Sequence, residues 1–173
     1  EGLKTHDVGK IGSALVDEVV FVTPARTLRK AEILAFLTAL YRGFPDWTYE
    51  HDEPVKCEDG SYDVNWRQCG SHTGALAFPG FDAVAATGRK VVIPEHFFHY
   101  RWGEDGLTEI RPDPVPGGAP RGIFEQIYED LFDPRRIELK PSVPSVDPQP
   151  HVNVKSFENR SHAFECATDR GRE

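Results

Sequence analysis

The 173-residue chain contains no methionine, few cysteines and no apolar run close to the roughly 20 residues that a membrane-spanning helix needs. We therefore expect no transmembrane segment. The three cysteines, Cys57, Cys69 and Cys166, have no CxxC spacing, so they indicate neither a disulfide framework nor a zinc site. One disulfide between Cys57 and Cys69 is the alternative, because the ends of two elements can bring these residues together. We predict no metal site.

Positive charge is also scarce: 20 lysines and arginines face 28 aspartates and glutamates, a formal net charge of −8. No stretch combines basic with aromatic residues, so nucleic acid is not an expected partner. The segment VPGGAPRG lacks the Lys-Ser or Lys-Thr ending of a phosphate-binding loop, and we predict no cofactor. The chain begins at Glu1, which predicts a processed N-terminus in a soluble protein and leaves an organellar location open.

The residues that are present suffice for one domain with a core, because 39% are hydrophobic and 11% aromatic. Apolar spacing predicts a short helix within Thr5–Val16, weakened by two glycines, and a stronger helix over Lys30–Tyr41. The segment EVVFVTP between them reads as a strand. Four strand-like segments follow in a row, which is typical of an antiparallel sheet, so the predicted fold class is α+β.

Two of these segments, WTYEHDEPVKC and SYDVNWRQCGSH, predict a hairpin around the turn EDG. Because side chains alternate along a strand, Tyr62 and Trp66 share one face and are candidates to line a pocket. Asp63 and Arg67 then form an exposed ion pair on the other face. The opposite parity would bury Asp63, Asn65 and Arg67 together as a polar site, and the sequence leaves both arrangements open.

The long segment RKVVIPEHFFHYRW carries the strongest candidate site. In a regular strand, His96 shares one face with three aromatic residues: Phe98, Tyr100 and Trp102. An aromatic face with one titratable group is typical of an apolar pocket with a polar handle, so His96 is the leading catalytic candidate. The alternative is a core-edge histidine bonded to a tyrosine or to the backbone.

The same alternation predicts that Val91 and Ile93 lie on the opposite face, together with His99. His96 and His99 then cannot hold a metal jointly, because they point to opposite sides. A bulge near Pro94 and Glu95 would change this parity.

Several segments in order resemble a known family: FVTP before a helix, FLTALYRGFPDW at its end, then GSHTGALAF, ATGRKVVIPEHFFHYRW and EDGLTEIR. Together, over about residues 13–113, they are similar to the SnoaL-like polyketide cyclases of the nuclear transport factor 2-like superfamily. The resemblance implies a cone-shaped α+β fold, in which a curved antiparallel sheet wraps around helices and leaves a pocket at its wide end. Members include cyclases, isomerases, dehydratases and domains that only bind or assemble.

The resemblance also implies two further catalytic candidates. Family cyclases use an aspartate on a late strand, and the nearest match here is Asp113, although Pro112 and Pro114 on either side suggest that the strand has ended. The segment GSHTG implies that His72 lies near the mouth of the pocket. Its alternative role is structural, with His72 bonded to backbone and holding the loop.

Two segments depart from the family pattern. PRGIFEQIYEDLFD, at about 120–132, has the spacing of an added amphipathic helix, which either closes the cone or docks on a partner. Proline spacing after it favours extended chain. We predict a domain over 1–135, including this helix, and an extended C-terminal tail over 136–173 that lies on another subunit.

Two hypotheses for function follow. The first is a non-catalytic SnoaL-like domain that acts as a binding or assembly subunit, through the tail or the sheet face or as a homodimer, with a small apolar ligand in its pocket. The second is a cyclase, isomerase or dehydratase that uses a pocket histidine or aspartate as general acid or base. An open cavity with polar groups would favour the enzyme, and a plugged cavity the scaffold.

Overall fold

The computed structural model describes residues 1–23, 26–114 and 121–128, which belong to one compact unit, Glu1–Glu129. The predicted tail over 136–173 and the end of the predicted added helix lie outside these residues. The helices are α1 (Val8–Ala14), α2 (Lys30–Gly43) and α3 (Arg121–Ile127). The strands are β1 (Leu15–Val22), β2 (Thr27–Arg29), β3 (Thr48–His51), β4 (Val55–Lys56), β5 (Tyr62–Ser71), β6 (Lys90–Trp102) and β7 (Leu107–Pro112).

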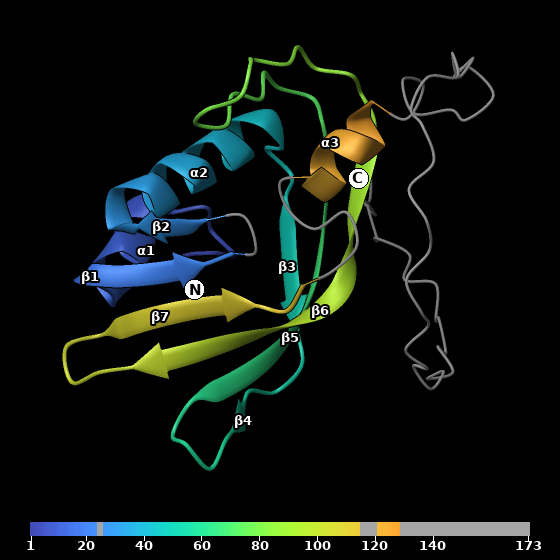
Figure 1. Cartoon of the computed structure of the whole chain (residues 1–173). Helices are drawn as coiled ribbons and strands as arrows, with labels where there is room; N and C mark the ends of the chain where they lie inside the picture. Colours follow the sequence, from blue (N-terminus) through green and yellow to red (C-terminus); the bar gives the residue numbers. More distant parts are fainter. Residues whose placement is uncertain (24–25, 115–120, 129–173) are drawn as a thin grey trace, which may run out of the picture. The chain divides into compact units, whose positions relative to one another are not determined.

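The strands form one curved sheet in the order β2-β1-β7-β6-β5-β3, with β4 also paired to β5 (Figure 1). All pairs are antiparallel except β1 with β7, which run parallel. The prediction of an α+β fold is confirmed, but that of a wholly antiparallel sheet is wrong at this pair. Strands β1 and β7 are far apart in the sequence, so the pattern of neighbouring segments cannot predict that they pair.

A β-bulge in β6 determines which side chains face α2. Trp66 on β5 pairs with His96, whereas Gln68 pairs with Ile93, so β6 carries one extra residue at Pro94 and Glu95. Beyond the bulge the alternation restarts in the other phase. Ile93 therefore lies on the same face as His96, and its predicted place on the opposite face is wrong for this reason.

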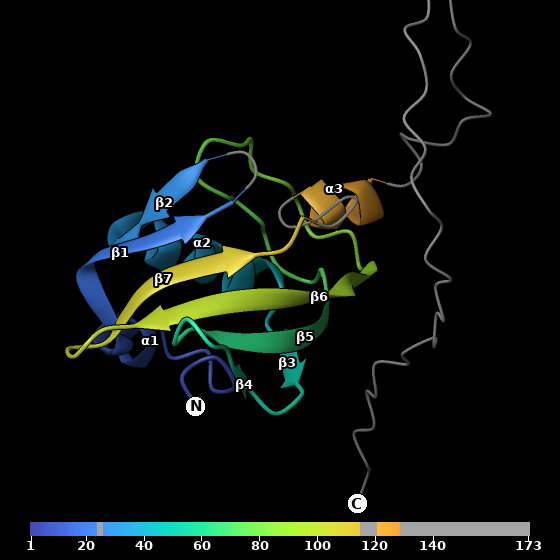
Figure 2. The same ribbon diagram turned by 60° about the horizontal axis from the view of Figure 1, so that its bottom comes forward.

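We call the face of the sheet toward α2 the inner face and the other the outer face. Figure 2 shows α2 behind the sheet and the outer face toward the viewer. The helix forms where its apolar stripe predicts, with Ile33 and Leu40 buried. At its C-terminus, the backbone amides of Thr73 and Gly74 donate to the carbonyl of Gly43 at 3.1 and 3.0 Å. The GSHTG turn thus satisfies the end of α2.

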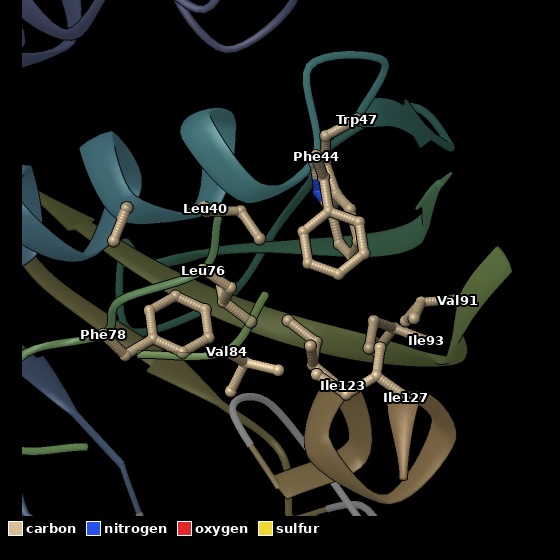
Figure 3. Packing of buried hydrophobic residues seen from close by; sticks show 11 residues of the cluster. Leu40, Phe44, Trp47, Leu76, Phe78, Val84, Val91, Ile93, Ile123 and Ile127 are labelled. Atoms are coloured by element: carbon tan, nitrogen blue, oxygen red, sulfur yellow. The ribbon is translucent and has the colours of Figure 1, made fainter. Parts of the chain in front are cut away.

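The main core lies between the end of α2, the loop after β5, the first part of β6 and α3 (Figure 3). Side chains from all four elements meet there: Leu40, Phe44, Leu76, Phe78, Val84, Val91, Ile93, Ile123 and Ile127. Phe44, Leu76 and Ile123 are fully buried. A second cluster joins α2 to β1 and β7 through Leu15, Val19, Leu28, Ile33 and Leu107.

Helix α3 packs inside the domain, as the closure alternative expected. The side-chain amide of Gln126 accepts from the backbone N–H of Val92 at 2.9 Å and donates to its carbonyl at 2.8 Å. It therefore makes the two hydrogen bonds that a neighbouring strand would make at this position of β6. Val92 lies before the part of β6 that pairs with β7, so the helix caps a stretch of strand edge.

Candidate ligand-binding cavity

A cavity of about 1130 Å³ opens between α2 and the inner face of the sheet. The apolar side chains of α2 form one wall, and β5 and β6 form the other. The structure places at this cavity all five residues that the alternation suggested as lining: Tyr62, Trp66, Phe98, Tyr100 and Trp102. Tyr62 and Trp66 are inner-face residues because β5 has the first of the two parities considered above.

The aromatic wall is held by hydrogen bonds among its polar atoms. The indole N–H of Trp66 donates to the hydroxyl of Tyr100 at 2.9 Å, and Tyr41 and Tyr49 share a hydrogen bond of 3.1 Å. Burial raises the pKa of the Tyr49 and Tyr100 phenols above the ordinary value, because the charged phenolate is disfavoured there. Both remain neutral, and Tyr100, already an acceptor from Trp66, keeps its own O–H to donate.

His96 lies on this wall, 8% exposed, with its ring 4.9 Å from that of Phe98. Its Nδ1 lies 2.7 Å from the carbonyl oxygen of Pro94. A carbonyl only accepts, so Nδ1 carries the hydrogen, and in the neutral ring Nε2 holds a lone pair. The bulge that includes Pro94 thus fixes both the face on which His96 lies and its tautomer.

His51, at the end of β3, also lines the cavity and is a candidate that sequence analysis missed. It pairs with Trp66 across the sheet, and the two rings are 4.8 Å apart. The signal was in the sequence: Tyr49 and His51 alternate with Glu50, which places both aromatic rings on one face of β3.

His72 does not line the cavity, and the expectation that it lies near the mouth is wrong. The side chain is fully buried, with its ring 5.1 Å from that of Phe44. Nδ1 accepts from the backbone N–H of Thr87 at 3.3 Å and lies 3.0 Å from the Thr87 hydroxyl. Burial lowers the pKa of His72, because the charged imidazolium is disfavoured. The residue holds the loop after β5, which is its structural alternative.

Asp113 lies on the outer face, away from the cavity. One of its oxygens is 2.9 Å from Nε2 of His99, whose Nδ1 is 2.6 Å from a carboxylate oxygen of Asp63. The hydrogen bonds to Asp113 and Asp63 raise the pKa of His99. Strand β7 ends at Pro112, as the flanking prolines suggested.

The predicted ion pair between Asp63 and Arg67 is absent from the described residues, since Asp63 bonds to His99 instead. Arg67 pairs with Asp52 at 2.8 Å and with Glu95 at 3.1 Å. The hydrogen bonds from Arg67 and, to a smaller extent, from Asn65 lower the pKa of Asp52. Of the predicted disulfide alternative, Cys57 is a free cysteine, so it is not bonded to Cys69.

Within residues 1–23, 26–114 and 121–128, no group of three or more histidine, cysteine, aspartate or glutamate side chains is arranged to hold a metal ion. In the same residues, no helix is long and apolar enough to cross a membrane. The polar side chains that line the cavity include imidazole, phenol and amide groups, the hydroxyl of Thr23, and the charged groups of Glu1, Lys10 and Arg26.

Comparison with known proteins gives similarity in structure alone. No protein-family model matches the sequence, and no curated protein is significantly similar to it. AclR from Streptomyces galilaeus, a proposed hydroxylase, matches over 83% of this chain and 78% of its own, with 17% identity and a TM-score of 0.58. A proposed SnoaL-like polyketide cyclase from Jannaschia sp. CCS1 matches over 73% and 94%, with 14% identity and a TM-score of 0.51.

TerC, which was co-crystallised with polyporic acid, matches over 73% of this chain and 90% of its own. The identity is 15% and the TM-score 0.52. At such identities the likeness concerns the fold and not the activity. The matches cover most of the chain, and its fold is that of the SnoaL-like polyketide cyclases.

Proposed function

We propose that the protein is a small-molecule enzyme of the cyclase, isomerase or dehydratase type, in which His96 moves a proton. The observation that carries this proposal is the open cavity of about 1130 Å³, whose wall is apolar except for a few polar groups such as His96. A scaffold domain was expected to have a plugged cavity. The pocket is large enough for a drug-sized molecule. A solved protein of this fold, TerC, was crystallised with polyporic acid.

The arrangement suits removal of a proton next to a carbonyl group. The lone pair on Nε2 of His96 takes the proton, and the electrons of the C–H bond move toward the carbonyl oxygen. The neutral O–H of Tyr100, on the same face of β6, donates a hydrogen bond to an oxygen of the substrate. The apolar wall keeps water from competing for these contacts.

Exchange with deuterated solvent tests this proposal without knowledge of the substrate. Small molecules extracted from the organism are incubated with the protein in D₂O, and mass spectrometry identifies any that gain deuterium. Because general acid–base catalysis contributes about 10²- to 10⁴-fold, we expect His96→Gln to slow this exchange at least 100-fold.

His99→Gln is the matched control, since it changes the same residue type on the same strand but on the outer face. It should leave the exchange rate unchanged. Exchange that is absent with the wild-type protein, or equally fast in His96→Gln, would contradict the proposal.

Assembly with other subunits, through the tail or the sheet face or as a homodimer, stays a prediction. The tail on which it chiefly depends lies outside the described residues. Native mass spectrometry of the protein from its source tests it, because co-release with larger proteins would favour assembly and release of a small molecule would favour the enzyme.

A further inference from the structure

His51 and His96 lie on either side of Trp66 in one row across the sheet. His51 pairs with Trp66 between β3 and β5, and Trp66 pairs with His96 between β5 and β6. All three side chains line the cavity. Since neighbouring strands are 4.7–4.9 Å apart, the Cα atoms of the two histidines are about 10 Å apart.

The two rings present the same hydrogen-bonding group to the cavity. Nδ1 of His51 lies 2.8 Å from the carbonyl oxygen of Asp52, as Nδ1 of His96 lies 2.7 Å from that of Pro94. In each ring the carbonyl fixes the hydrogen on Nδ1, so that neutral Nε2 accepts. Nε2 lies further from the backbone than Nδ1, and His51 is exposed whereas His96 is buried.

Trp66 provides a fixed surface between these two acceptors. Its indole N–H is bonded to Tyr100, and the ring of Tyr49 packs edge-on at 5.9 Å. The indole is therefore held from two sides and cannot turn freely. A flat apolar molecule that lies along this row meets a lone pair near each of its ends.

We propose that His51 is a positioning residue, which accepts a hydrogen bond from a hydroxyl or N–H group of the ligand while His96 accepts a second one. The ligand class is a planar, mostly apolar molecule with hydrogen-bond donors at two separated positions. Nε2 of His96 has one lone pair, so it accepts from a donor of the ligand only while it is not removing a proton. Its role as the base rests on the proposed function, whereas the pairing of the two acceptors rests on their geometry.

Two probes that differ only in their donors test the pairing. 2,6-Dihydroxynaphthalene has a hydroxyl at each end, and 2,6-dimethoxynaphthalene has the same ring system without a donor. Binding is measured by titration calorimetry or by quenching of tryptophan fluorescence. Because one neutral hydrogen bond is equivalent to about three- to tenfold in affinity, we expect the wild-type protein to prefer the dihydroxy probe about tenfold or more.

His51→Phe keeps a ring of similar size and removes the lone pair. It should reduce the preference for the dihydroxy probe about three- to tenfold, with little change in affinity for the dimethoxy probe. His96→Phe should have the same effect, and His99→Gln on the outer face none. If the role of His51 is purely structural, His51→Phe should weaken the binding of both probes alike. The ratio of the two affinities then stays unchanged, which separates this case from a positioning role.

Equal affinity of the two probes, no binding of either, or a preference that survives His51→Phe would each overturn the inference. The result is independent of the exchange experiment. If His51→Phe removes the preference but no deuterium exchange depends on His96, the binding pair stands and the proposed catalysis falls. If exchange depends on His96 but the preference does not depend on His51, the reverse holds.

Discussion

The two faces of the same sheet differ in how their polar groups are satisfied. On the outer face, charged side chains pair with one another, as Arg67 does with Asp52 and Glu95. On the inner face, His51 and His96 each use one nitrogen on a backbone carbonyl. The charged side chains of the outer face are therefore paired with one another. On the inner face, the second nitrogen of each histidine can bond to a ligand.

The largest expected effect is a loss of stability, which should be large for a buried phenylalanine on the inner side of the sheet and small for an exposed one on the outer face. Phe44 is fully buried against Trp47 and His72, and Phe97 on the outer face is 45% exposed. Phe44→Ala should lower the free energy of unfolding by about 3–5 kcal/mol, because it removes contacts and leaves a cavity. Phe97→Ala should stay within about 0.5 kcal/mol of the wild type. Urea denaturation measures both, and similar losses would break the comparison.

The second prediction concerns acid, to which buried His72 is sensitive. Its folded-state pKa lies below the ordinary 6.5, so below pH 6.5 the unfolded chain binds a proton that the folded chain does not. Stability should fall as the pH drops from 6.5 toward the folded-state pKa. His72→Asn keeps an acceptor for Thr87 and cannot titrate, so this part of the pH dependence should disappear. An unchanged slope in His72→Asn would assign the acid sensitivity to other groups.

The third prediction concerns salt and the outer face. Arg67→Met removes the cation shared by several carboxylates, and the loss in free energy of unfolding should be roughly a quarter or less of that of Phe44→Ala, because exposed ion pairs contribute little. In about 0.5 M NaCl the difference from wild type should shrink, since salt screens exposed charges. The Phe44→Ala difference should not shrink. A salt-independent effect of Arg67→Met would show that its alkyl packing matters more than its charge.

The smallest effect should come from His99, with the opposite pH dependence to His72. Asp113 and Asp63 raise its folded-state pKa, so its contribution is complete below pH 6.5 and is lost as the pH rises through the folded-state pKa. Arg111 lies opposite His99 on β7, and its guanidinium bonds to Glu109. The acidic groups that contact the His99 ring are Asp113 and Asp63. NMR titration should show the His99 pKa falling in Asp113→Asn. No change would mean that this bond does not hold in solution.

The positions of the elements were largely predictable from local pattern. The apolar stripe of α2 and the Gly60 turn between β4 and β5 are properties of short segments, and both formed as expected. The parity of β5 was one of two arrangements that the sequence left open, and the structure has the one in which Trp66 and Tyr62 face the cavity. Local periodicity is informative wherever one face of an element is buried.

The remainder depended on contacts between distant segments. The parallel pairing of β1 with β7, the burial of His72 under Phe44 and the docking of Gln126 on Val92 each join parts of the chain that no local pattern relates. His51 was missed for a different reason, since its parity was readable but β3 was taken only as one arm of a hairpin. The bulge in β6 was foreseen as an option, and only the register could decide it.

That bulge makes the chain tolerant of a shortening at one place in β6. Deleting one residue at Pro94 or Glu95 would remove the bulge and leave Ile93 and His96 two positions apart, which is the period that keeps both on the inner face. His96 would still lie opposite Trp66, and His99 would stay among the surface carboxylates. A relative with one residue fewer here would therefore present the same histidine to its ligand, and an alignment should place its gap at 94–95.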